Sequence, residues 1–120
     1  MEKIIQAETH AEFLNKAFGT NYLGWYKSRW NYGSDTWVWM IYIDGKIRRG
    51  WKNSFFANGN ILEEYVGAGE PTYKNEVERK YRIVVQIIEK NGHREYHILG
   101  KYRYDKERSN KRKHIFIKEN

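Results

Sequence analysis

An amphipathic pattern near the start of the chain predicts one short helix over residues 9–18. Its apolar positions recur at helical spacing and form one stripe: Phe13, Leu14, Ala17 and Phe18. Thr9 and Glu12 have the spacing of a capping box, and Gly19 suits the position at which a helix ends. We expect this helix to lie against a sheet and to have a structural role.

Period-two patterns predict strands in most of the remaining chain. The strongest covers residues 36–43, where both faces are apolar, so we expect a central or covered strand. Asp44-Gly45 predicts a hairpin turn that pairs this strand with residues 46–51. Further strands are expected at residues 55–56, 61–62, 81–88, 96–104 and 114–118, with turns at Asn58-Gly59 and Asn91-Gly92.

The strand at residues 96–104 alternates with one interruption. Its expected first face carries Tyr96, Ile98, Tyr102 and Tyr104, and the other carries His97, Lys101 and Arg103. Gly100 lies in the first row and predicts a bend or the close approach of another backbone.

These elements predict an α+β, mostly β fold. We expect an antiparallel sheet curled into a barrel or half-barrel, with one N-terminal helix. Residues 1–120 form a single domain in this prediction, because a turn-rich loop at residues 66–76, with the only proline, divides two halves that each lack a sufficient core.

Composition excludes several classes of protein. Hydrophobic residues make up 40% and aromatic residues 17% of the chain, which is typical of a folded domain. The chain contains no cysteine, so it forms neither disulfides nor thiolate metal sites. No apolar run is long enough to span a membrane, and residues 1–6 lack the apolar core of a signal peptide. We therefore expect a cytoplasmic protein that binds no membrane.

The positive charge is concentrated in the last third of the chain. Residues 79–120 hold 13 Lys and Arg against 5 Asp and Glu, whereas residues 1–78 hold 9 against 10. A basic surface of this kind attracts polyanions, and nucleic acid before others.

Three clusters are candidates for nucleic-acid binding. Two interleave rings with cations, as stacking on bases and neutralising phosphates require. The third is basic without rings in its loop and is expected to contact phosphates. The first cluster contains Trp25, Tyr26, Lys27, Arg29 and Trp30; the second contains Arg48, Arg49, Trp51 and Lys52; the third contains Lys101, Arg103, Arg108, Lys111, Arg112 and Lys113.

The competing interpretation is that such rings build the core. We favour it for Trp37 and Trp39, which alternate along a strand, and leave both readings open for Trp25, Tyr26 and Trp30. If the chain binds nucleic acid, the fold must bring the aromatic clusters and the C-terminal charge together on one face.

Evidence for an enzyme is weaker. His93 and His97 are four apart in a strand region and do not predict a metal site. Glu78-Arg79-Lys80 resembles the acid-x-Lys tail of metal-dependent nucleases, with Glu70 or Glu76 as the other carboxylate, but the loop offers no strand to orient that carboxylate. We predict no catalytic residue, no bound metal and no cofactor, and a binding module rather than an enzyme.

Two parts of the chain resemble known DNA-recognition modules. Phe18-Gly19-Thr20-Asn21-Tyr22, Gly24-Trp25-Tyr26-Lys27-Ser28 and Val38-Trp39-Met40 are similar to a module that accompanies HNH and related endonucleases in bacterial and phage restriction-type proteins. Tyr96-His97-Ile98-Leu99-Gly100-Lys101-Tyr102-Arg103-Tyr104 is also similar to a strand of SRA-like and other PUA-like domains that read modified bases. The resemblance covers residues 13–118 and implies DNA recognition, with cleavage supplied by a separate domain or subunit.

The sequence thus predicts a nucleic-acid-binding module, with DNA favoured, in a restriction or defence context. Trp25, Tyr26 and Trp30 would form or edge a pocket for a modified base. Two alternatives stay open: a phage or mobile-element protein that inhibits a host defence enzyme, and a small metal-dependent nuclease built on Glu78 and Lys80. The residues do not decide between DNA and RNA, between plain and modified bases, or between oligomeric states.

Overall fold

The structure is a computed structural model that describes residues 3–24, 26–47, 50–66, 80–110 and 112–119. These residues form one helix and eight strands. The bounds are β1 (Lys3–Gln6), α1 (His10–Phe18), β2 (Arg29–Asn31), β3 (Thr36–Ile41), β4 (Trp51–Phe56), β5 (Ile61–Val66), β6 (Tyr81–Lys90), β7 (His93–Tyr104) and β8 (Lys113–Lys118). The prediction of a mostly β fold with one N-terminal helix is confirmed.

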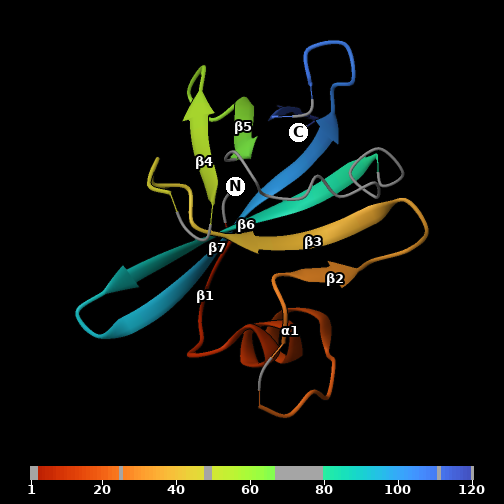
Figure 1. The fold of residues 1–120 in the computed structure, drawn as a ribbon. Coiled ribbons are helices and arrows are strands. Elements are labelled where there is room, and N and C mark those ends of the chain that lie inside the picture. Colours follow the sequence, from red (N-terminus) through yellow and green to blue (C-terminus); the bar gives the residue numbers. More distant parts are fainter. Residues whose placement is uncertain (1–2, 25, 48–49, 67–79, 111, 120) are drawn as a thin grey trace.

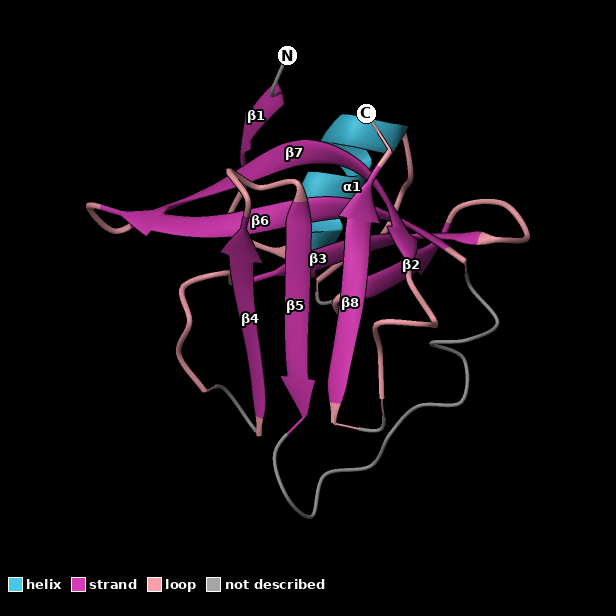
Figure 2. Cartoon of the chain, turned by 90° about the horizontal axis from the view of Figure 1, so that it is seen from above, coloured by secondary structure: helices cyan, strands magenta, loops and turns pink. Residues whose placement is uncertain are grey.

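All eight strands belong to one sheet that curls into a half-barrel. The strand order is β2-β3-β6-β7-β8-β5-β4, and β1 pairs with β7 outside this path. Strands β4, β5 and β8 run side by side and cross the layer formed by β3, β6 and β7 (Figure 2). Helix α1 lies on the other side of that layer (Figure 1). We call the side facing β4, β5 and β8 the concave face, and the side that α1 covers the helix face.

The helix begins and ends as its sequence predicts. The Thr9 side chain accepts a hydrogen bond from the Glu12 backbone N–H (3.1 Å), which satisfies one of the free donors of the first turn. At the other end Gly19 adopts φ 71°, a left-handed conformation that glycine reaches without a Cβ clash. The apolar stripe then places Phe13 and Leu14 fully out of solvent against the sheet.

The sheet has an apolar core on each face, and β3 contributes to both. Val38 and Met40 join Phe13 and Leu14 of α1 on the helix face. Trp39 and Ile41 lie on the concave face, in a core with Leu62, Val84, Tyr102 and Phe116. Every residue of β3 is buried, which confirms the expected covered strand and the core position of Trp37 and Trp39.

Strand β7 carries the predicted bend, but the bend moves its later side chains to the other face. Val84 pairs with Gly100 and Val85 pairs with Ile98, so Leu99 is an extra residue in β7 and the ladder is irregular there. Tyr96 and Ile98 contact the helix-face core, whereas Tyr102 and Tyr104 contact the concave core. The prediction of one common face for these four residues is wrong, because one inserted residue reverses the alternation.

The hairpin predicted at Asp44-Gly45 does not form. Both edges of β3 are already paired, antiparallel with β2 and parallel with β6, and β4 pairs with β5 instead. The sheet is therefore mixed and not purely antiparallel. Asp44 makes a local turn by accepting from the Lys46 N–H (3.0 Å), and the Gly45 N–H donates to the Asn53 carbonyl (3.1 Å). The chain thus leaves β3 and continues to β4 on the concave side.

The other two predicted turns are present. Asn91 and Gly92 both have positive φ (51° and 78°) and join β6 to β7, as a tight primed hairpin turn requires. Asn58 and Gly59 lie in the turn between β4 and β5, where the Tyr102 hydroxyl donates to the Gly59 carbonyl (2.5 Å). Burial raises the pKa of Tyr102 above its usual value. The loop predicted at residues 66–76 falls almost entirely outside the described residues, and no described helix is long and apolar enough to cross a membrane.

Candidate nucleic-acid interface

A row of polar and aromatic side chains crosses the concave face, with contributions from all seven strands of the main path. We call it the concave row. In strand order from β4 to β2, its members are Asn53, Glu64, His114, Tyr104, Arg82, Trp37 and Arg29.

One half of the concave row is a buried polar group. Asn53 pairs in register with Glu64, and Glu64 pairs with His114. His114 Nδ1 lies 3.1 Å from Glu64 Oε1, in hydrogen-bond distance. Their side chains are only 2% and 4% exposed, so the pair is shielded from water and its geometry is well defined. Buried polar side chains need hydrogen-bond partners, and His114 and Glu64 provide one for each other.

The middle of the concave row is a ring cluster that reaches the edge of the sheet. Tyr104 makes an edge-on contact with His114, with ring centroids 6.1 Å apart, and a tilted contact with Phe116 at 5.6 Å. Phe116 also contacts Trp39 at 5.3 Å. Tyr104 is only partly buried, so it connects the interior of the half-barrel with the surface.

The other half of the row alternates guanidinium groups and rings. The Arg82 guanidinium is fully buried and lies over Trp37 (4.5 Å), Trp39 (4.8 Å) and Phe116 (4.8 Å). Arg29 lies over the same Trp37 ring at 4.6 Å. Cation–π contacts of this kind partly offset the cost of burying the Arg82 charge. The concave face therefore has a cationic, ring-lined end.

Sequence reasoning missed most of this row. Arg29 was among the candidate residues, and Asn53 directly follows the second cluster, but Arg82, Glu64, His114 and Tyr104 were not predicted. The signal was present: the first three of these four residues each alternate with an apolar residue of the concave core, Val84, Leu62 and Phe116 respectively. A charged side chain at an inward position of a strand is informative, because burying its charge costs free energy unless another group compensates it.

The first predicted cluster is divided between the two faces. Arg29 lies on the concave face with Trp37, whereas Tyr26 and Trp30 pack against the helix-face core. The ring centroids of Trp30 and Phe18 of α1 are 5.1 Å apart, and Trp30 Nε1 donates to the Tyr22 hydroxyl (2.9 Å). The ring centroids of Tyr26 and Tyr22 are 4.6 Å apart. Burial raises the pKa of Tyr26. Lys27 is exposed. A DNA-binding role for Tyr26, Lys27 and Trp30 stays a prediction.

The second cluster is also split by strand alternation. Trp51 falls on the concave side, the side of Asn53 and Phe55, and is half-buried. Lys52 falls on the outer side, with its ammonium 5.7 Å from the Tyr65 ring. Arg48 and Arg49 lie outside the described residues.

The C-terminal basic residues gather near the edge where β7 ends and β6 and β8 begin. Lys101 Nζ lies 4.2 Å and Lys80 Nζ 5.5 Å from the Tyr81 ring, on the helix face. Arg103 pairs with Glu119 (2.8 Å). Lys80, Arg103 and Tyr104 line a shallow depression with Asp105, Lys106 and Glu107. We call this edge the basic rim.

Three more predicted phosphate contacts flank the basic rim. Lys113 is exposed and lies 3.9 Å from Glu63, and Arg108 pairs with Asp105 at 3.3 Å. The Arg112 backbone N–H donates to Asn110 (2.8 Å), and its side chain is exposed. Trp25 and Lys111 lie outside the described residues. The rim therefore brings much of the C-terminal charge close to Tyr104 of the concave row, while Tyr26 and Trp30 lie elsewhere.

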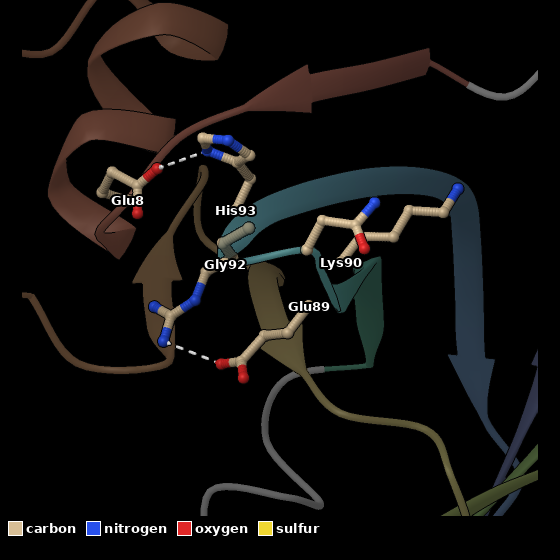
Figure 3. Close-up of a pocket in the computed structure, with 7 residues that line it drawn as sticks. Glu8, Glu89, Lys90, Gly92 and His93 are labelled. Atoms are coloured by element: carbon tan, nitrogen blue, oxygen red, sulfur yellow. Dashed lines mark hydrogen bonds and ion pairs between the residues drawn. The ribbon is translucent and has the colours of Figure 1, made fainter.

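The structure gives no support to a metal-dependent nuclease. Glu70, Glu76 and Glu78 lie outside the described residues, and among those described no group of three His, Asp or Glu could hold a metal ion. His93 lies 3.8 Å from Glu8 and His97 lies 3.0 Å from Glu95, so the two histidines contact different carboxylates. His93 and Glu8 line a pocket with Glu89 and Arg94 at the β6–β7 turn (Figure 3), which belongs to the helix side and not to the concave row.

Comparison with known proteins identifies a family and similar solved structures. The SET and RING associated (SRA) domain family matches residues 1–118. The 5-hydroxymethylcytosine-specific restriction enzyme AbaSI has a similar structure, with a TM-score of 0.73 and 19% sequence identity over 95% of this chain and 38% of that chain. At this identity the likeness shows the fold, and the chain spans well under half the length of that enzyme. No curated protein sequence matches the chain.

The family match extends over nearly the whole chain and agrees with the curled sheet and single helix seen here. It also agrees with the sequence resemblance of residues 96–104, which lie in β7, to a strand of SRA-like domains. The chain belongs to the SRA family, whose domains bind DNA.

Proposed function

We propose that this chain reads a modified base in double-stranded DNA, and that the base is turned out of the helix onto the concave row. The observation that carries the proposal is the row itself: rings, two guanidinium groups and a buried polar group on one face, with partly buried Tyr104 in the middle. A base removed from a duplex needs aromatic walls and polar atoms for its edge.

The basic rim supports the same proposal. Lys80 and Lys113 would contact phosphates beside the turned-out base, because Lys80 precedes β6 and Lys113 begins β8 at the strand ends next to Tyr104. Such contacts give affinity and orientation without sequence choice. The side chains that read the base and those that anchor the phosphates would thus be different residues along the same edge of the sheet.

A restriction or defence context follows from the structural relative. AbaSI is specific for 5-hydroxymethylcytosine and is a restriction enzyme. We propose that a nuclease domain or subunit acts together with this chain, and that 5-hydroxymethylcytosine is the first base to test. The comparisons support neither an inhibitor of a host defence enzyme nor a nuclease within this chain.

The test is binding to matched duplexes that differ at one cytosine: unmodified, 5-methylated or 5-hydroxymethylated. We expect the affinity for one modified duplex to exceed that for the unmodified duplex by roughly 10-fold or more, and affinity to fall steeply with added salt. Equal affinity for all three duplexes would show a DNA-binding domain that does not read modification. Absence of binding at low salt would overturn the proposal.

A further inference from the structure

Asn53 occupies the centre of β4 on the concave face and is 9% exposed. Its side-chain oxygen, Oδ1, is buried and has no hydrogen-bond partner among the described residues. The other neighbours in the concave row, Glu64 and His114, contact each other. Asn53 therefore contributes a buried acceptor at the end of the row.

An acceptor of this kind is unusual in a folded protein. Most buried polar side-chain atoms have a partner, and leaving one without a donor costs about 1–3 kcal/mol. Leucine, which is similar in size, would fill the position without that cost. The polar residue is thus explained more readily by a ligand that supplies the missing donor than by folding.

The neighbouring carboxylate favours this orientation of the amide. Glu64 lies directly across from Asn53 in the β4–β5 ladder. Cross-strand neighbours have Cβ atoms about 5 Å apart. Because a carboxylate accepts hydrogen bonds, the NH₂ end of Asn53 is better placed toward Glu64 and the oxygen away from it. The amide is then fixed as an acceptor toward a ligand.

We infer that Asn53 is a specificity-determining residue whose Oδ1 accepts a hydrogen bond from an exocyclic amino group of the turned-out base. This inference rests on the proposed function and names the atom that reads the base edge. A pyrimidine with an amino group at C4 satisfies Asn53, whereas a pyrimidine with a carbonyl at C4 places two acceptors together. Cytosine derivatives are therefore preferred over the matching uracil derivatives.

The experiment compares two duplexes that carry the same 5-hydroxymethyl group at one position, on cytosine in one and on uracil in the other. We expect the unaltered chain to bind the cytosine duplex roughly 10- to 100-fold more tightly, the range for loss of one good base-edge contact. Asn53→Leu should reduce this ratio to near one. Asn53→Ala should do the same and provides a second variant.

A matched control lies next to Asn53 in the same strand. Ser54 alternates to the outer side of β4, opposite Glu63 of β5. Ser54→Ala should leave the base ratio unchanged. Thermal unfolding of Asn53→Leu gives an independent readout: we expect an equal or higher Tm than the unaltered chain, because the variant removes a buried acceptor that lacks a donor.

The outcomes separate this inference from the proposed function. If the unaltered chain binds neither duplex, the proposed function fails. If it binds and prefers the cytosine duplex, but Asn53→Leu and Asn53→Ala keep that preference, only the inference is wrong. A large fall in Tm for Asn53→Leu together with an unchanged ratio would assign Asn53 a structural role.

Discussion

The Tyr96 hydroxyl shows how one atom joins the helix to the sheet. Arg94 Nη1 lies 3.2 Å from this oxygen, and His10 Nδ1 lies 2.7 Å from it. Arginine only donates, so the Tyr96 oxygen accepts from Arg94, and His10 Nδ1 lies within hydrogen-bond distance of the same oxygen. Burial lowers the pKa of His10 to about 4, and the Arg94 charge adds to this effect.

This arrangement predicts how stability depends on pH. Because the pKa of His10 is about 4 in the folded chain and 6.5 when unperturbed, the unfolded chain binds more protons between these values. The free energy of unfolding should fall as the pH drops from about 6.5 to about 4. Urea unfolding across this range should show a shallower fall for His10→Gln. An identical pH dependence in the variant would contradict the assigned neutral state.

At the residue scale, sequence reasoning identified the core but not the polar row. Trp37 and Trp39 were assigned to the core because they alternate in an apolar strand, and both are buried. The sequence does not single out Arg82, because the local pattern of an apolar strand places a single cation at an outward-facing position. Its neighbours Trp37 and Phe116 come from distant segments, so no local pattern could reveal that contact.

Strand β7 holds the half-barrel together at the element scale. It pairs with β6 along nearly its whole length; on its other edge its first part pairs with β1 and its last three residues pair with β8. The irregularity at Leu99–Gly100 lies between these parts, where Gly100 adopts φ 138°. It delivers Tyr102 and Tyr104 to the concave face, so the position of Tyr104 in the concave row depends on it.

Substitution of Gly100 tests this dependence. A side chain at this φ is strained, and replacing glycine by alanine at a positive φ destabilises by more than about 1 kcal/mol. Gly100→Ala should lower the free energy of unfolding in urea by at least that amount. If stability were unchanged, the strand would not need this backbone conformation.

Local signals were sufficient for the helix and for two turns, and insufficient for strand pairing. Thr9, Gly19 and Asn91-Gly92 act through backbone geometry within a few residues, so their sequence identifies them. Asp44-Gly45 has an equally good turn sequence, yet β3 pairs with β6, about 45 residues later. Parallel pairing is decided by the whole fold, and no dipeptide encodes it. The four residues of β1 were not predicted, because so short a strand has little pattern to read.

In the proposed function, different parts of the whole molecule read the base and anchor the phosphates. The concave row lies inside the half-barrel, and the basic rim lies at the adjoining strand ends. Sequence analysis expected the aromatic clusters and the C-terminal charge on one face. The structure instead brings part of the C-terminal charge close to Tyr104, while Tyr26 and Trp30 pack beside α1.

Two lysines at opposite ends of β6 offer a matched test of the rim. Lys80 precedes the strand at the rim, and Lys90 ends it at the β6–β7 turn; both are exposed. Lys80→Ala should reduce the slope of log affinity against log salt by about 0.9, as expected when one phosphate contact is lost. Lys90→Ala should leave the slope unchanged. Equal effects of the two variants would mean that the whole basic surface acts without a defined rim.

The most direct measurement for the whole account is photocrosslinking from the base that is read. A duplex with 5-iodocytosine at the read position is bound and irradiated, and the crosslinked peptide is identified by mass spectrometry. We expect the crosslink on an aromatic residue of the concave face, at Trp37, Trp51 or Tyr104. A crosslink at Tyr26 or Trp30, on the helix face, would contradict the assignment of base reading to the concave row.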